Sequence, residues 1–197
     1  MPSLSILSAF VRRAMAAAAF LMPVGTSAWA AELDGVEIPA TRQAAGKTLL
    51  LNGYGLRNYS ILGIHIYVAG LYLEHLNTDP DAIIQSPETK LVAVSFRRDV
   101  SADSARDAWR IALQNNCVAP CVLDPDDVAR FLAVVPAMHA GDTCNLLFEG
   151  HRAVVTVNGQ QIGTISHTML ADAVLATFIG PKPASPALKR GLLSGHA

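Results

Sequence analysis

The sequence has 197 residues, of which 51% are hydrophobic and 16% charged, and its formal net charge at pH 7 is -1. This near-neutral chain has no basic field for the phosphates of a nucleic acid, which excludes nucleic-acid binding as its main function. The length and apolar content are those of one domain with a substantial core.

The first thirty residues have the pattern of a secretory signal peptide. Arg12 and Arg13 precede the apolar run 14–24, and Ala28-Trp29-Ala30 is a small-residue cleavage pattern. We expect cleavage after Ala30, which leaves residues 31–197 as one mature domain, periplasmic or secreted. The alternative is an uncleaved anchor. It is disfavoured because the apolar run of about a dozen residues is shorter than the roughly 20 that span a bilayer.

The segment after the leader has β-strand patterns. Residues 33–42 predict a short strand or hairpin. The next strand, within 47–62, contains Asn52-Gly53 and Tyr54-Gly55, where glycine allows a bend or bulge. Ile64–Leu73 predicts a strand with two apolar faces. One face carries Ile64, Ile66, Val68, Gly70 and Tyr72, and the other carries His65, Tyr67, Ala69, Leu71 and Leu73. Such a strand is central, with helices on one side and another apolar element on the other.

The remaining segments alternate between strand and helix patterns. We predict a strand over 90–98, a helix over 101–116 capped by Ser101, and a helix from Asp124-Pro125 to about Pro136. Three strands follow over 143–150, 152–159 and 160–166, then a helix that ends at Gly180-Pro181 and a short helix from Ser185. This order predicts an α+β fold, an antiparallel sheet with helices packed mainly on one face.

The sequence has three cysteines, Cys117, Cys121 and Cys144, so one thiol stays free if two of them form a disulfide. A Cys117–Cys121 bridge is the first expectation in an oxidising compartment, because Pro120 prevents a straight helix between them, and Cys144 is the alternative partner. Three thiolates with His139 are the ligand types of a zinc site, but their spacing fits no familiar zinc motif. We therefore expect no metal.

Two stretches resemble the chalcone isomerase family. The first reads GYGLRNYSILGIHIYVAGLYLE and contains Gly53, Gly55, Arg57 and Leu71-Tyr72-Leu73. The second, FIGPKPASPALKRGLL, is similar to the closing helix of the family, and the segments between follow the order of its bacterial, exported branch. The resemblance implies an open-faced β-sandwich, a long antiparallel sheet with helices on one side and a ligand cleft between sheet and helices.

The resemblance also implies a site. The arginine matching Arg57 stabilises negative charge in the plant isomerases and grips a carboxylate in the fatty-acid-binding relatives, so Arg57 and Tyr67 are the predicted ligand-binding residues. A guanidinium remains charged when partly buried, which suits that use. A surface ion pair for Arg57 and a core role for Tyr67 are the alternatives. His65 is expected to share the face of Tyr67 in a structural role.

Differences from the isomerases favour binding over catalysis. Phe96 stands where the plant enzymes have a lysine, and Ala105 where they have a tyrosine that positions the ketone. Arg97 and Arg98 are expected to be solvated, although a register shift would let one of them act in the cleft. No catalytic residue is assigned with confidence, and no cofactor or metal is expected.

The leading hypothesis is an exported protein that binds a small amphipathic anion, a fatty acid or an aromatic acid, without isomerase activity. The alternatives are an intramolecular lyase or isomerase acting on a chalcone-like enone, and a structural or adaptor protein with no cavity beside Arg57. Gly53-Tyr54-Gly55 opens no helix, which makes nucleotide binding improbable.

Overall fold

The computed structural model describes residues 29–59, 63–117 and 119–195. In these residues, strands β3–β9 form one seven-stranded sheet in chain order, and all neighbours are antiparallel. Its strands are β3 (Thr41–Ala44), β4 (Lys47–Tyr59), β5 (Ile64–Leu73), β6 (Lys90–Phe96), β7 (Thr143–Glu149), β8 (Arg152–Val157) and β9 (Gln160–Ile165). The antiparallel α+β prediction is confirmed.

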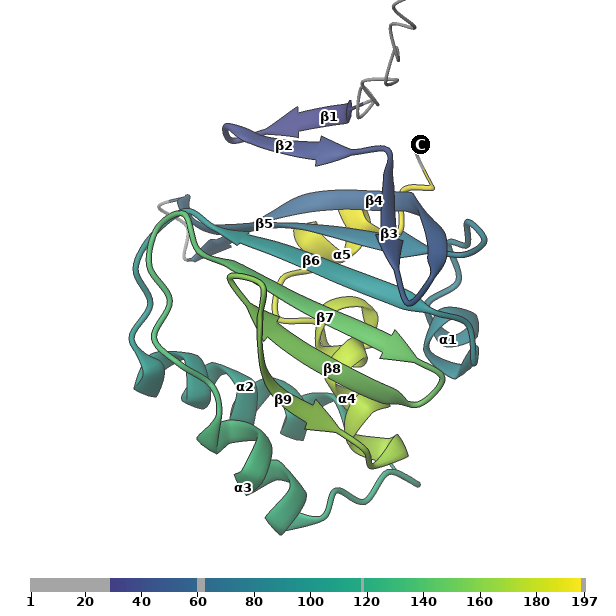
Figure 1. Ribbon diagram of the computed structural model, residues 1–197. Coiled ribbons are helices and arrows are strands. Elements are labelled where there is room, and N and C mark those ends of the chain that lie inside the picture. Colours follow the sequence, from purple (N-terminus) through teal and green to yellow (C-terminus); the bar gives the residue numbers. More distant parts are fainter. Residues whose placement is uncertain (1–28, 60–62, 118, 196–197) are drawn as a thin grey trace, which may run out of the picture.

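Helices cover one face of this sheet, and a separate hairpin covers part of the other (Figure 1). The helices are α1 (Pro80–Gln85), α2 (Ala102–Asn116), α3 (Pro125–Ala133), α4 (Thr168–Ile179) and α5 (Pro186–Leu192). The hairpin consists of β1 (Trp29–Leu33) and β2 (Val36–Pro39). The predicted signal peptide lies outside the described residues, apart from Trp29 and Ala30, which begin β1.

Strand β5 is apolar on both sides because each side belongs to a different core. Tyr67 and Leu71 pack in the core under the helices, whereas Val68 and Tyr72 pack in the core beneath the hairpin, with Ile38 of β2. The apolar element expected opposite the helices is therefore the chain's own N-terminal hairpin.

Gly53 of the Gly-x-Gly element and Gly191 of α5 let α5 approach β4. A Cβ on Gly53 would lie 2.2 Å from the carbonyl oxygen of Gly191, and one on Gly191 would lie 2.3 Å from that of Tyr54. Beside them, the buried Asn52 donates to the carbonyl oxygen of Leu192 over 2.9 Å. Asn52 is also the extra residue of the predicted bulge in β4, since pairing with β5 skips from Leu51 to Gly53.

A second bulge corrects the predicted face of His65. Arg57 pairs with Tyr67 and Asn58 pairs with His65, so Ile66 is an extra residue that reverses the alternation of side chains. His65 Nδ1 lies 3.0 Å from Asp34 Oδ1 in the hairpin turn. His65 therefore points away from the helices, and the prediction that it shares the face of Tyr67 is wrong.

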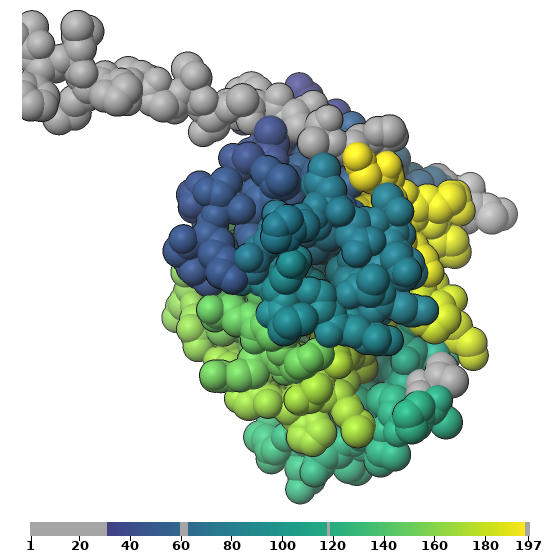
Figure 2. Space-filling model, turned by 90° about the vertical axis from the view of Figure 1, so that its right-hand side faces the viewer, coloured from purple at the N-terminus to yellow at the C-terminus, as the bar shows by residue number. Residues whose placement is uncertain are grey.

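Helix α1 was not predicted from the sequence. Asp79 accepts hydrogen bonds from the backbone N–H groups of Asp81 and Ala82, and Pro80 occupies the first turn. Figure 2 shows this end of the molecule, with α1 at its centre between the β3–β4 segment and the C-terminal segment. The helix buries only Ile83, which gives too weak an apolar period to be recognised.

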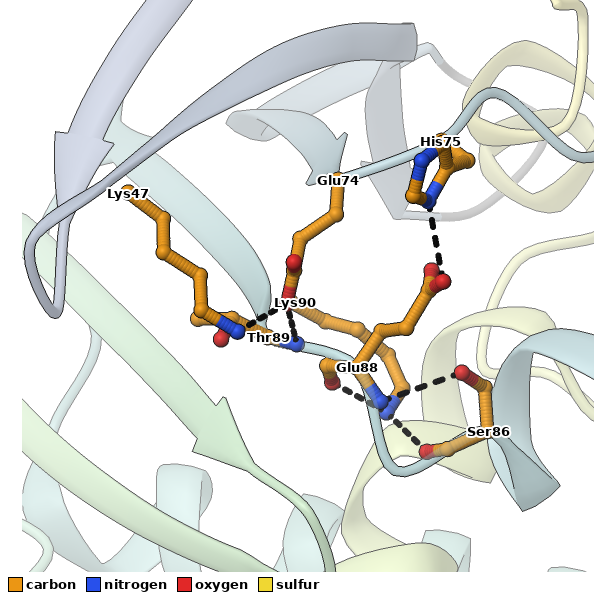
Figure 3. A network of polar contacts seen from close by, with 7 residues as sticks. All are labelled: Lys47, Glu74, His75, Ser86, Glu88, Thr89 and Lys90. Carbon is orange, nitrogen blue, oxygen red and sulfur yellow. Dashed lines mark hydrogen bonds and ion pairs between the residues drawn. The ribbon is translucent and has the colours of Figure 1, made fainter.

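A polar network surrounds the buried Lys90 where β6 begins (Figure 3). Lys90 Nζ donates to the carbonyl oxygens of Ser86 (2.6 Å) and Glu88 (2.9 Å), and burial lowers the pKa of Lys90. Lys47 and Glu74 form an ion pair of 2.7 Å beside it. These contacts join the β5–β6 connection to the sheet.

Among the described residues, no helix is long and apolar enough to cross a membrane.

Candidate functional site

A cavity of about 430 Å³ lies between the sheet and helices α2, α3 and α4. Its volume is within the range of small-molecule sites, about 300–1,000 Å³. The sheet side is formed by β4–β9, and the helix side by α2, the end of α3 with its following loop, and α4. Figure 1 shows these helices lying along one side of the curved sheet.

The interior of the cavity is apolar and its rim is polar. Buried lining residues include Val94, Leu146, Val155, Phe131 and Phe178, whereas exposed ones include Tyr59, Arg98, Asp99, Ser101 and Ser104. A cavity with an apolar interior and a polar rim suits a ligand with an apolar body and a polar end.

An aromatic cluster holds the helices around the interior. The ring of Trp109 on α2 meets that of Phe131 on α3 with centroids 5.2 Å apart, and that of Phe178 on α4 at 5.9 Å. Both contacts have edge-to-face geometry, which aromatic rings prefer. The helix side of the cavity is thus a connected wall.

Arg57 and Tyr67 lie together on the sheet side of the cavity, directly paired across β4 and β5. The guanidinium carbon of Arg57 is 5.5 Å from the centroid of the Tyr67 ring, a cation–π distance. Among the described residues, Arg57 forms no ion pair with a carboxylate, so its charge is available to an anion in the cavity. Ligand binding by both residues remains a prediction.

Tyr67 is only 7% exposed, and its hydroxyl has the Arg57 guanidinium as a polar neighbour. Burial raises the pKa of this phenol, an effect that the neighbouring Arg57 charge partly opposes. The phenol of Tyr67 is therefore neutral near neutral pH and keeps its proton as a donor, and Tyr67 lines the cavity.

Arg97 and Arg98, which follow β6, contact different parts of the protein. Arg97 Nε lies 3.2 Å from Asp34 Oδ2 in the hairpin turn, on the side opposite the helices. Arg98 lines the cavity opening. Both arginines are exposed, as expected, and Arg98 is the one that also lines the cavity.

Phe96 and Ala105 both line the cavity. Phe96 packs against Tyr67 with ring centroids 5.6 Å apart. Neither side chain has a titratable group. Both side chains are therefore apolar parts of the cavity wall.

Cys117 and Cys121 form a disulfide, as predicted, and link the end of α2 to the loop before α3. The bridge removes two thiolates from the alternative zinc site. Cys144 is a free thiol on β7 that lines the cavity, and burial raises its pKa to about 11. No sequence pattern indicates that Cys144 lines the cavity, because this depends on the position of the helices.

Comparisons with known proteins agree with this fold. A sequence profile described as chalcone isomerase-like matches residues 30–194, and the chain belongs to that family. A solved structure of a fatty-acid binding protein from Arabidopsis thaliana superposes with a TM-score of 0.66 at 19% identity, covering 81% of this chain and 92% of that one. No curated protein sequence matches the chain.

Proposed function

We propose that this protein binds a small amphipathic anion, a fatty acid or an aromatic acid, in the cavity between its sheet and helices. The observation that carries the proposal is the Arg57 guanidinium, which has no carboxylate partner among the described residues and lies over the Tyr67 ring on the wall of a cavity with an apolar interior. In this arrangement Arg57 offers two parallel N–H donors to a carboxylate, and Tyr67 offers a third donor.

Binding is favoured over isomerisation by the walls of the cavity. Phe96 and Ala105 provide no proton donor or acceptor where the plant enzymes have a lysine and a tyrosine. General acid–base catalysis needs a titratable group within hydrogen-bond reach of the reacting atoms. A purely structural role is disfavoured as well, because it requires that no cavity exist beside Arg57.

Export is part of the same proposal. The leader pattern in residues 1–30 supports a periplasmic or secreted protein. The disulfide between Cys117 and Cys121 agrees with an oxidising compartment.

Titration of delipidated protein with dodecanoate tests the proposal. Saturable binding of one molecule per chain is expected, and Arg57→Gln should weaken it by about 1.5 kcal/mol or more, since a charged hydrogen bond is lost. Arg97→Gln is the matched control, because Arg97 faces the hairpin and should not affect affinity. Equal affinity in the wild type and the Arg57 variant would remove Arg57 from the site.

A further inference from the structure

We propose that Arg98 is a second anion-binding residue, and that the cavity prefers amphiphiles with a doubly charged head group, such as an alkyl phosphate, over monocarboxylates. The inference rests on the proposed function, because it assumes that an amphipathic anion enters this cavity. It adds the class of head group and a residue that determines it.

Two guanidinium groups line the same cavity. Arg57 lies on β4 and Arg98 lies just after β6, at the opening. Among the described residues neither is paired with a carboxylate, whereas the adjacent Arg97 is paired with Asp34. One of two consecutive arginines is thus neutralised on the outer face, and the other retains its charge at the cavity.

The backbone around Arg98 is held in place on both sides. Arg97 N–H donates to the carbonyl oxygen of Ile66 over 2.8 Å, and Val100 and Met138 exchange two backbone hydrogen bonds of 2.8 and 2.9 Å. These hydrogen bonds hold the backbone on both sides of Arg98 in place. A guanidinium on a fixed backbone loses less conformational entropy when it binds an anion.

Asp99 is the one carboxylate among the described residues that line the cavity, and it does not neutralise Arg98. Asp99 Oδ1 accepts a hydrogen bond from the backbone N–H of Ala140 at 2.9 Å and lies 3.6 Å from His139 Nδ1. Its carboxylate therefore faces the loop after α3. The local excess of positive charge at the opening remains.

The remaining polar groups of the rim are uncharged. Ser101 Oγ accepts the N–H of Ser104 as the cap of α2 and donates to Ser104 Oγ at 2.9 Å. These hydroxyls are engaged with each other, so an incoming anion is left chiefly with the two guanidinium groups. Apart from Arg57, Arg98 and Asp99, no charged side chain lines the cavity among the described residues.

The guanidinium groups of Arg57 and Arg98 together offer more hydrogen-bond donors than one carboxylate needs. A carboxylate has two oxygens, and a single bidentate guanidinium can donate to both of them. A phosphate monoester has three terminal oxygens and a charge of about -1.5 to -2 at pH 7, so it accepts hydrogen bonds from both arginines. The apolar interior then holds the alkyl chain.

Calorimetric titration with dodecyl phosphate and dodecanoate, which have the same chain length, separates the two head groups. At pH 8 and below the micellar concentrations, the wild type should bind dodecyl phosphate at least about tenfold more tightly. Arg98→Gln should weaken dodecyl phosphate binding about tenfold or more and dodecanoate binding less than about threefold. Arg97→Gln is the control of equal charge change, and it should leave both affinities unchanged.

Arg98→Lys keeps the charge but loses the fork, so it should recover part of the dodecyl phosphate affinity. Because Arg98 is exposed, each variant should keep the thermal midpoint of the wild type. Equal affinities of the wild type for both ligands, or equal losses for both in Arg98→Gln, would overturn the inference while dodecanoate binding by Arg57 stands. If the wild type binds neither ligand, the proposed function fails with it.

Discussion

At the scale of single residues, pairing decides which arginine is available to a ligand. Arg97 meets Asp34 in the hairpin turn, whereas Arg57 stacks over the ring of Tyr67 and has no carboxylate partner among the described residues. The sequence places Arg57 near the site through its family motif. It cannot show which of Arg97 and Arg98 faces the cavity, because this depends on backbone hydrogen bonds made by the chain beyond β6.

Cys144 provides a residue-scale test of cavity occupancy. Its pKa of about 11, raised by burial, leaves about a hundredfold less thiolate at pH 8 than a thiol of pKa 9.0, so alkylation by iodoacetamide should be slow in the folded protein. The rate should rise with pH until the pH passes the folded pKa. Bound dodecanoate should slow it further, as read by mass spectrometry.

The unfolded protein in urea is the control for this test, and it should be alkylated at an ordinary rate. Cys117 and Cys121 do not interfere while their disulfide is intact. Rapid alkylation of the folded protein at pH 8, unaffected by dodecanoate, would show that Cys144 is not on the wall of the site.

At the scale of elements, two local irregularities limited the prediction. The bulge at Ile66 reverses strand alternation, so His65 faces Asp34 instead of the helices. Helix α1 is six residues long, too short for a recognisable apolar period, although Asp79-Pro80 is a helix-start signal. The longer elements were predictable because their apolar spacing is sustained over two or more turns or along a whole strand.

Helix α2 offers the element-scale test, because Ala105 and Ala108 line the cavity from its inner side. Ala108→Phe should fill part of the cavity and lower dodecanoate affinity about tenfold or more, while the thermal midpoint stays equal or rises with the added apolar burial. Ile111→Phe on the exposed side of α2 is the matched control.

If Ala108→Phe lowers the thermal midpoint, Ala105→Phe offers a second position on the same wall. Wild-type affinity in a well-folded cavity-filling variant would show that dodecanoate binds elsewhere on the protein. Both variants are measured by the same calorimetric titration and by thermal melting followed by circular dichroism.

At the scale of the whole molecule, the sheet is covered on both faces, and only the helical side leaves space. The hairpin β1–β2 packs closely on the outer face, while α2, α3 and α4 enclose the cavity of about 430 Å³ on the inner one. The sequence indicated both apolar faces of β5. It did not reveal the volume left between sheet and helices, since that depends on how far the aromatic cluster around Trp109 holds the helices away.

The central claim is that a negative head group binds beside Arg57, and ¹³C NMR of [1-¹³C]dodecanoate bound to the protein tests it most directly. A bound carboxylate next to a guanidinium has a lowered pKa. Its carboxyl resonance should therefore keep the ionised shift at pH values where the free acid is protonated, and Arg57→Gln should abolish this difference. A bound resonance that titrates like the free acid in the wild type would contradict the account.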